Sequence, residues 1–348
     1  NEIAGMSFDC SCGERHFVEL NTIEIGKGVN SKVPEIAASF KTGKVFLVAD
    51  SNTYRVCGEK VHKQLMDNGF NKLKLFIFDT PDHRLVPDEK SVGRLLIEIE
   101  EDTSLIIAVG SGVINDIAKF ISHKTGIPCI VVGTAPSMDG YASVVSPLIV
   151  GGKKITYKST YPIGFIGDTD ILKDAPLEML QAGFGDIVGK LTALADWDLA
   201  RRLGKERYCR TCEILVRDAL KKCIDNTSGI VARDEKAIGY LTEGLILSGV
   251  AIGLFGDSRP ASGSEHFFAH YWDVDAISRN VGHSLHGNAV GVGTVIVAHI
   301  YELMKSYIPE DLNYPKPEEV TALLGRLGSH DNPRDLGISR ELFEKSVY

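Results

Sequence analysis

The chain has 348 residues and a formal charge of −8, and 44% of its residues are hydrophobic while 24% are charged. These values are typical of a soluble globular protein with room for two domains. There is no basic stripe to displace counterions, which argues against nucleic acid as the main partner, and no apolar run approaches the roughly 20 residues of a membrane span. The first residues lack a charged segment followed by an apolar core, so we expect no signal peptide and a cytoplasmic location.

The first half of the chain alternates apolar runs with helical patterns. Continuous apolar strands between helices predict a parallel, doubly wound sheet of the Rossmann type, whose ligands bind beyond the carboxyl ends of the strands. A hairpin is expected within residues 141–161, where Gly151 and Gly152 separate two β-rich stretches. The expected strands are 45–49, 73–78, 105–109 and 128–132. One helix is expected to follow the first strand and end at Leu65, and two more are expected over 91–99 and 113–122.

After about residue 168 the pattern changes to long helices. We expect an α/β dinucleotide-binding domain over residues 1–162 and an all-α domain that binds metal and substrate over residues 163–348. The helices expected in the second domain are 187–203, 209–225, 235–252 and a last one within 339–348.

The seven cysteines are an odd number in a long chain, which suits a reducing compartment better than a disulfide framework. Cys10 and Cys12 near His16, and Cys209 with Cys212, are each half of a zinc pattern. Neither pair is accompanied in sequence by a second pair at the spacing of a zinc finger. We therefore expect ordinary free thiols.

A glycine-rich turn, Gly-Ser-Gly-Val-Ile-Asn-Asp at residues 110–116, follows the third expected strand and opens a helix. Glycines let the backbone approach a phosphate closely, and a helix N-terminus offers free amides. The third glycine of the usual dinucleotide fingerprint is absent, so the turn is equally consistent with having no ligand. Asp50 ends the first expected strand, where it could accept hydrogen bonds from a ribose, favouring NAD, or cap the next helix.

The loop after the fourth expected strand, residues 133–140, carries further polar groups at the same sheet edge. Thr134 and Ser137 offer hydroxyls there, and Asp139 lies in a glycine-bounded segment where a simple turn is the alternative explanation. Two polar loops at adjacent strand ends favour a shared ligand.

Three residues of the second half lie in segments that are suited to exposing a metal ligand. Asp186 follows Gly-Phe-Gly, His266 ends Ser-Gly-Ser-Glu-His, and His286 precedes a glycine. One carboxylate and two imidazoles suit a divalent metal with an open position. His270 shares a helix face with His266 and is assigned to substrate contact or proton transfer, and spacing alone would allow His283 in place of His286. The other histidines are expected to be structural or solvated: His16, His62, His83, His123, His299 and His330.

These motifs resemble those of the polyol and iron-type alcohol dehydrogenases that share the dehydroquinate synthase fold. The resemblance covers nearly the whole chain. The strings Ala-Pro-Ser-Met-Asp-Gly and Ser-Gly-Ser-Glu-His look specific to the glycerol-1-phosphate branch. The segments that carry the resemblance are 110–116, 134–143, 183–186, 262–266 and 285–287.

The resemblance implies a role for each motif. Asp186, His266 and His286 would hold the metal, which is typically zinc in this family and nickel in some bacterial relatives. The resemblance thus selects His286 instead of His283 as the second histidine ligand. Asp139 and His270 would contact substrate and form the catalytic pair. The contacts to NAD or NADP would come from Gly112, Val113, Ile114, Asn115, Asp116, Thr134, Ser137 and Ser143.

The implied reaction is the reversible reduction of dihydroxyacetone phosphate to sn-glycerol 1-phosphate, which would serve phospholipid biosynthesis. A homo-oligomer such as a dimer is the ordinary expectation for a soluble enzyme. Candidate cations for the substrate phosphate are Lys153, Lys154 and Lys158 on the hairpin and Lys190 one turn after Asp186. Three alternatives stay open: a glycerol or polyol dehydrogenase, a cyclising lyase of the dehydroquinate synthase type that uses NAD and a metal, and a nucleotide-sensing protein without catalysis.

Overall fold

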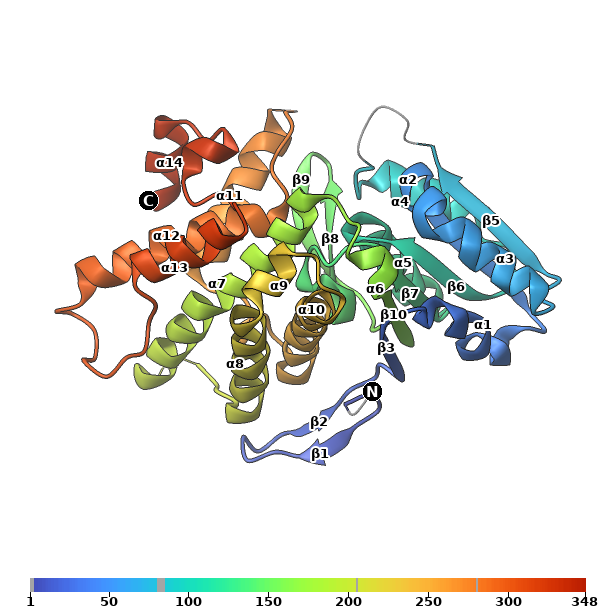
Figure 1. The fold of residues 1–348 in the computed structure, drawn as a ribbon, viewed down its shortest axis with the longest axis horizontal. Coiled ribbons are helices and arrows are strands. Elements are labelled where there is room, and N and C mark those ends of the chain that lie inside the picture. Colours follow the sequence, from blue (N-terminus) through green and yellow to red (C-terminus); the bar gives the residue numbers. More distant parts are fainter. Residues whose placement is uncertain (1–2, 80–84, 205, 280) are drawn as a thin grey trace. The chain divides into compact units, whose positions relative to one another are not determined.

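The computed structural model describes residues 3–79, 85–204, 206–279 and 281–348 (Figure 1). His83, expected to be structural or solvated, lies outside these described residues. Contacts divide the chain into two compact units. The sheet unit comprises Asn1–Ser7, Phe17–Pro136 and Gly140–Ala175, and the helical unit comprises Phe8–His16, Ser137–Asp139 and Pro176–Tyr348.

The sheet unit is built on six parallel strands in the order β3-β10-β7-β6-β4-β5. The predicted parallel sheet is confirmed, and four of its strands match the predicted ones. The strands are β3 (Thr22–Gly26), β4 (Lys44–Asp50), β5 (Leu73–Phe78), β6 (Thr103–Gly110), β7 (Cys129–Gly133) and β10 (Gly164–Asp168). The helices are α1 (Val33–Ile36), α2 (Ser51–Thr53), α3 (Glu59–Asp67), α4 (Glu89–Glu98), α5 (Gly112–Thr125) and α6 (Thr169–Leu172).

Strand β10 pairs with β3 on one side and β7 on the other, so it is an interior strand of the sheet. Its sequence, Gly-Phe-Ile-Gly-Asp, is short and has glycine at two of five positions. The sequence pattern therefore does not predict this strand. Five residues that the sequence places in the helical domain thus belong to the sheet. The domain boundary itself stays a prediction.

The central strands are buried on both faces, as expected for a parallel sheet covered by helices. Alternate residues of β4 and β6, such as Val45, Leu47 and Ile107, pack with α1 and α3 into one core. The opposite face carries residues such as Phe46 and Ile106, which are equally buried. Helix α5 packs against β4, β6 and β7. This two-sided burial explains why the strands read as continuous apolar runs.

A separate hairpin of β8 (Val145–Val150) and β9 (Lys153–Lys158) confirms the turn predicted at two glycines. Gly151 and Gly152 have φ of 58° and 72°, a backbone conformation that residues with a side chain rarely adopt. Lys153, Lys154 and Lys158 all lie on β9.

The helical unit contains long helices and a short N-terminal hairpin, β1 (Ser7–Asp9) and β2 (Arg15–Phe17), whose outer residues belong to the sheet unit. Within the described part of the chain, two helices, α10 (Glu235–Phe255) and α12 (His286–Met304), are long and apolar enough to cross a membrane by length and composition alone. However, 67% of the apolar window of each is buried inside the protein, as in an ordinary core helix. The helices are α7 (Leu177–Arg202), α8 (Arg210–Asp225), α9 (Thr227–Val231), α10 (Glu235–Phe255), α11 (Ser264–Ser278), α12 (His286–Met304), α13 (Pro317–Arg326) and α14 (Arg340–Val347).

Candidate active site

Asp186 lies within helix α7 and is fully buried. Lys190, one turn later, donates from Nζ to Asp186 Oδ1 at 2.7 Å and to Asp139 Oδ2 at 2.8 Å. The Asp139 amide donates to Asp186 Oδ2 at 3.0 Å, and the Ser248 hydroxyl donates to Asp139 Oδ2 at 2.8 Å. Asp139 and Asp186, which the sequence assigns to substrate and metal, therefore meet in one network.

The Lys190 ammonium and the carboxylates of Asp139 and Asp186 stabilise one another in their charged forms. Burial alone would raise the pKa of Asp186, but Lys190 together with His266 and His286 outweighs it and lowers the pKa to about 2. Burial alone would lower the pKa of Lys190, and Asp139 and Asp186 outweigh it and raise that pKa. Lys190 is fully buried, with its ammonium between two carboxylates. Its prediction as a cation for the substrate phosphate is therefore wrong.

His266 lies in the first turn of α11, and its two ring nitrogens have different surroundings. Nδ1 is 2.7 Å from Glu265 Oε1, and Nε2 is 3.8 Å from Asp186 Oδ1. Glu265 is fully buried, and it also accepts hydrogen bonds from the Thr192 hydroxyl at 2.6 Å and the Gly263 amide at 2.7 Å. A carboxylate on Nδ1 orients the ring and favours an unprotonated Nε2, as behind many metal-bound histidines.

Glu265 is a site residue that the sequence did not single out. Burial raises its pKa, but the hydrogen bond and charge of His266 outweigh this and lower it, so Glu265 is held ionised. The only signal in the sequence is its place directly before His266, and adjacency along a helix does not predict a contact between side chains.

His286 opens helix α12, and its ring meets the two histidines of α11. The His286 ring centroid is 5.2 Å from that of His266 and 5.3 Å from that of His270. The buried Asp273 places Oδ2 3.7 Å from His286 Nδ1. Ligand atoms of His270, Asp273 and His286 lie within 4.8 Å of one another. The alternative, His283, has Nδ1 3.4 Å from Asp273 Oδ1 and is more exposed than His286.

Glycines allow α7 and α12 to cross at backbone contact, and this crossing brings Asp186 beside His286. A Cβ on Gly287 would lie 1.8 Å from the Ala182 carbonyl oxygen, and one on Gly185 would lie 2.3 Å from the Gly287 carbonyl oxygen. Each glycine adjoins one of the two site residues in sequence. The Gly-Asp and His-Gly pairs of the motifs are thus required by helix packing.

The donor set fits a divalent metal. Asp186 is an ionised, buried carboxylate, and His266 has its second nitrogen oriented by Glu265 and its ring 5.2 Å from that of His286. One carboxylate and two imidazoles are one of the ligand sets found at catalytic zinc sites.

The carboxyl edge of the sheet brings the predicted cofactor loops of the sheet unit together. The Thr134 amide donates to the Gly110 carbonyl at 3.1 Å across the ends of β6 and β7. The buried Tyr141 donates from its hydroxyl to the Ala135 carbonyl at 2.6 Å and lies 3.2 Å from the Ser111 hydroxyl. The glycine turn and the loop after β7 therefore form one surface.

Lys119 on α5 is a second residue that the sequence did not single out. Its buried Nζ donates to the carbonyls of Gly140 at 2.6 Å, Ser143 at 2.9 Å and Val145 at 3.0 Å, and to the Ser143 hydroxyl at 3.1 Å. Asn115, four residues earlier, also donates to the Gly140 carbonyl, at 3.3 Å. A lone lysine on the apolar face of α5 was the available signal.

The predicted cofactor residues fall into three places. Gly112, Val113, Ile114, Asn115 and Asp116 form the first turn of α5, Thr134 and Ser143 lie in loops of the sheet unit, and Ser137 belongs to the segment grouped with the helical unit. Asp50 accepts hydrogen bonds from the amides of Asn52 and Thr53, so it caps α2.

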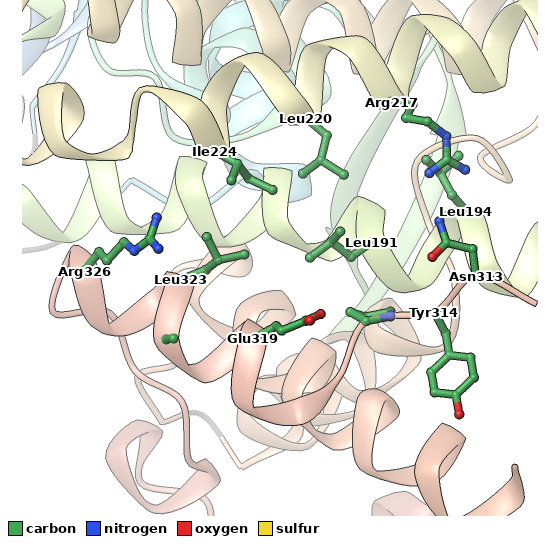
Figure 2. A pocket seen from close by; sticks show the side chains of 12 residues that line it. Leu191, Leu194, Arg217, Leu220, Ile224, Asn313, Tyr314, Glu319, Leu323 and Arg326 are labelled. Carbon is green, nitrogen blue, oxygen red and sulfur yellow. The ribbon is translucent and has the colours of Figure 1, made fainter.

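A cavity of about 430 Å³ lies elsewhere in the helical unit, between α7, α8 and α13 (Figure 2). Leu191, Leu220 and Leu323 line its middle, and Arg217 and Arg326 lie toward its two ends. None of its lining residues is a predicted site residue.

Comparison with known proteins identifies the family. The glycerol-1-phosphate dehydrogenase [NAD(P)+] of Geobacillus thermodenitrificans is 36% identical to this chain over 374 aligned positions, which cover 100% of this chain and 93% of the relative. The chain belongs to the glycerol-1-phosphate dehydrogenase family. A further family member, from Bacillus licheniformis, is 37% identical and covers 97% of this chain and 87% of its own. Residues 24–176 match the family model described as iron-containing alcohol dehydrogenase.

Solved structures outside the glycerol-1-phosphate dehydrogenase family share the fold. The crystal structure of glycerol dehydrogenase from Schizosaccharomyces pombe has a TM-score of 0.74 at 18% identity and covers 94% of this chain and 82% of its own. A 1,3-propanediol oxidoreductase structure has a TM-score of 0.72 at 18% identity, covering 94% and 90%. The predicted fold class, a Rossmann-like sheet followed by a helical region, is confirmed.

Proposed function

We propose that this protein catalyses the reversible, NAD(P)-dependent reduction of dihydroxyacetone phosphate to sn-glycerol 1-phosphate. Membership of the glycerol-1-phosphate dehydrogenase family over nearly the whole chain supports this reaction. The structural observation that supports the proposal is that His266 lies 3.8 Å from Asp186 and packs its ring against His286, which also packs against His270.

Asp186, His266 and His286 would hold a divalent metal, zinc by expectation and nickel as the alternative. A divalent ion at this place supplies Lewis-acid stabilisation of the negative charge that develops on the substrate oxygen. Glu265 would orient the His266 ring through Nδ1, and the Lys190 ammonium favours the ionised form of Asp186. The ionised carboxylate is the form that binds a metal.

The first turn of α5 would bind the pyrophosphate of NAD or NADP, because Gly112 leaves the backbone open and the helix N-terminus offers its amides. The bound nicotinamide supplies the hydride. Thr134, Ser137 and Ser143 would add hydroxyl contacts. Lys119 fixes the loop that carries Ser143.

Asp139 and His270 would act on the substrate itself. Lys190 and Ser248 hold the Asp139 carboxylate in one orientation, so that it can accept a hydrogen bond from a substrate hydroxyl. His270 lies beside His286, where its imidazole can exchange a proton with the substrate hydroxyl oxygen. Lys153, Lys154 and Lys158 are the cations proposed for the substrate phosphate.

We also place this enzyme in the cytoplasm as a homo-oligomer, such as a dimer, serving phospholipid biosynthesis, with neither nucleic acid nor membrane as a partner. The acidic charge supports this view of its partners.

The decisive assay follows NADH and NADPH oxidation with dihydroxyacetone phosphate, with dihydroxyacetone as the unphosphorylated control, after metal analysis of the purified protein. We expect stoichiometric oxidation with the phosphorylated ketone and far slower oxidation with the control. Comparable kcat/KM for both would favour a polyol dehydrogenase. Product formation without net oxidation would favour a lyase, and no turnover of the metal-loaded protein would contradict the proposal.

A further inference from the structure

The N-terminal hairpin brings together the two half-sites that look unrelated in the sequence. Cys10, Cys12 and His16 lie on or beside the turn between β1 and β2, and Cys209 is the residue before α8. The ligand atoms of these four residues all lie within 4.8 Å of one another. His16 and Cys209 are separated by 193 positions, so sequence spacing could not show that they meet.

Three of the six distances among these ligand atoms match the edges of a tetrahedron, and the other three are within 4.8 Å. Cys10 Sγ is 3.7 Å from Cys209 Sγ, and His16 Nε2 is 3.4 Å from both Cys12 Sγ and Cys209 Sγ. With zinc–sulfur bonds of about 2.3 Å and zinc–nitrogen bonds of about 2.0 Å, a tetrahedral site has edges of about 3.8 Å between sulfurs and about 3.5 Å between sulfur and nitrogen.

A hydroxyl beside one of the sulfurs reinforces this arrangement. The Thr211 hydroxyl lies 3.2 Å from Cys10 Sγ, where it can donate. Such bonds stabilise thiolates and orient ligands around a metal.

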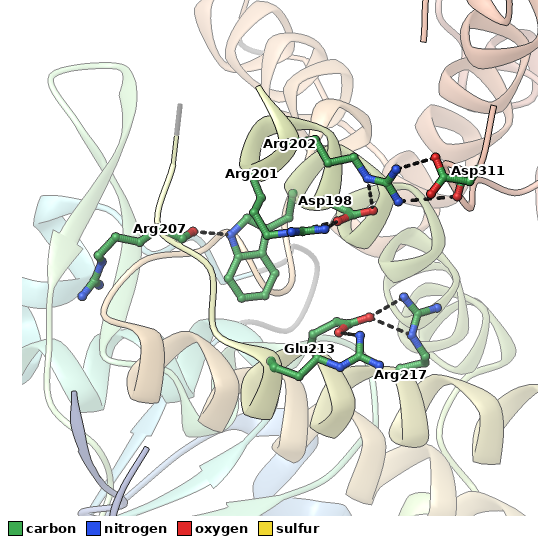
Figure 3. Close-up of polar contacts among 9 residues, drawn as sticks. Asp198, Arg201, Arg202, Arg207, Glu213, Arg217 and Asp311 are labelled. Carbon is green, nitrogen blue, oxygen red and sulfur yellow. Dashed lines mark hydrogen bonds and ion pairs between the residues drawn. The ribbon is translucent and has the colours of Figure 1, made fainter. Parts of the chain in front are cut away.

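The residues on either side of Cys209 are held by contacts within the helical unit, and Figure 3 shows those of Arg207, Glu213 and Arg217. Just before Cys209, the Arg207 carbonyl accepts a hydrogen bond from Trp197 Nε1 on α7 at 2.9 Å. In the first turn of α8, the buried Glu213 forms ion pairs with Arg210 and Arg217, the latter at 2.8 Å. Cys209 therefore belongs to a preformed half-site.

We propose that Cys10, Cys12, His16 and Cys209 bind a structural zinc ion that fastens the N-terminal hairpin to α8. Each of the three thiols gives its proton to solvent when the metal binds. Four protein ligands fill the tetrahedron, so this site, unlike the one around Asp186, has no position for substrate. The hairpin needs such an anchor, because a two-stranded hairpin alone is marginally stable.

The buried Cys212 lies next to Cys209, and it is the residue most able to change the ligand assignment. A disulfide between Cys10 and Cys209 is the competing explanation of their approach. It would leave Cys12 and His16 without a common partner.

The test replaces zinc by cobalt in the full-length protein and records the near-ultraviolet charge-transfer band between thiolate and cobalt. The proposed active-site ligands include no sulfur, so this band reports the cysteine site alone. We expect the band in the wild type and in His266→Ala, and its loss, with one metal equivalent fewer, in Cys209→Ala. Cys223→Ala, on the same helix but away from the cluster, is the matched control and should keep both the band and the metal.

Loss of the band in Cys209→Ala should come with a lower Tm, while Cys12→Ser provides a second ligand variant at a more exposed position. Absence of the band from wild type, or its persistence in Cys209→Ala, would overturn the proposal. An intact mass two hydrogens below the reduced value in freshly purified protein would establish the disulfide instead. Loss of the band in Cys212→Ala but not in His16→Ala would overturn the proposed ligand set. Activity enters none of these outcomes, so they are independent of the proposed reaction.

Discussion

Among the described residues, the helical unit contains two clusters of side chains proposed to bind metal, and they differ in chemistry and assembly. Asp186, His266 and His286 come from three helices packed through glycines, and they offer oxygen and nitrogen atoms with His270 beside them. The second cluster, Cys10, Cys12, His16 and Cys209, offers three sulfurs and one nitrogen from the N-terminal hairpin and the residue before α8. Three protein ligands leave one metal position open, which suits catalysis when a group that can exchange protons lies nearby. Four protein ligands, three of them thiolates, fill the coordination shell, which suits a structural ion. The comparison teaches that the number and chemical type of the ligand atoms distinguish a catalytic metal site from a structural one.

The largest effect is expected from Asp186→Asn. The loss of the buried charge should remove the active-site metal and lower kcat by about a thousandfold or more, because several kcal/mol of transition-state stabilisation are lost. The measurement is kcat with dihydroxyacetone phosphate, together with metal content. Asp198→Asn, at an exposed ion pair on the same helix, is the control and should retain activity. Full activity of metal-free Asp186→Asn would remove this cluster from the mechanism.

Gly287→Ala should come next. Its Cβ would meet the Ala182 carbonyl oxygen at 1.8 Å, so α7 and α12 must separate. We expect a loss of about 1–3 kcal/mol or more in the free energy of unfolding, measured by urea denaturation, and weaker active-site metal binding. Gly325→Ala in α13 has no atom within 4 Å of its Cβ, and it should be neutral or stabilising. Equal stabilities of the two variants would refute the close crossing.

Glu265→Gln should weaken active-site metal binding by about 10- to 100-fold, because His266 loses the carboxylate that orients it. The measurement is metal affinity by competition with a chelator, with the cobalt–thiolate band as an internal reference that should not change. Glu243→Gln, which removes only a part-exposed ion pair with Lys222, serves as the matched change. Unchanged affinity in Glu265→Gln would mean that Glu265 only supports packing.

The smallest effect is expected outside both clusters, from Gly112→Val in the first turn of α5. Crowding of the pyrophosphate should raise the KM for the nicotinamide cofactor by about tenfold, a free energy of about 1.4 kcal/mol, with both metal sites unaffected. Steady-state kinetics with varied NADH measures this. An unchanged KM would remove Gly112 from the cofactor site.

Much of the fold could be predicted from the sequence, because continuous apolar strands and helical periodicity are local signals. The strands β4 to β7 and the glycine turn at Gly151 were read in this way. Strand β10 was not, because five residues with two glycines carry too little pattern.

The site was predictable only in part, for a related reason. Asp186, His266 and His286 lie in recognisable motifs, but the contacts of Lys119 and Lys190 depend on helix packing that no local pattern reports. The sequence suggests a phosphate role for Lys190 because it does not show that this side chain is buried between two carboxylates. It does not reveal the cysteine cluster either, because the two halves lie far apart along the chain.

The strand order constrains how the sheet unit can be synthesised and folded. Among the residues that the structure describes, edge strand β3 pairs only with β10, and Thr22 lies opposite Gly164. The ribosome must therefore release well over a hundred further residues before β3 finds its neighbour, whereas β4, β6 and β7 can associate earlier. In a nascent chain halted after Gly133, strand β3 would still be unpaired beside a partial sheet, and chaperones could bind it.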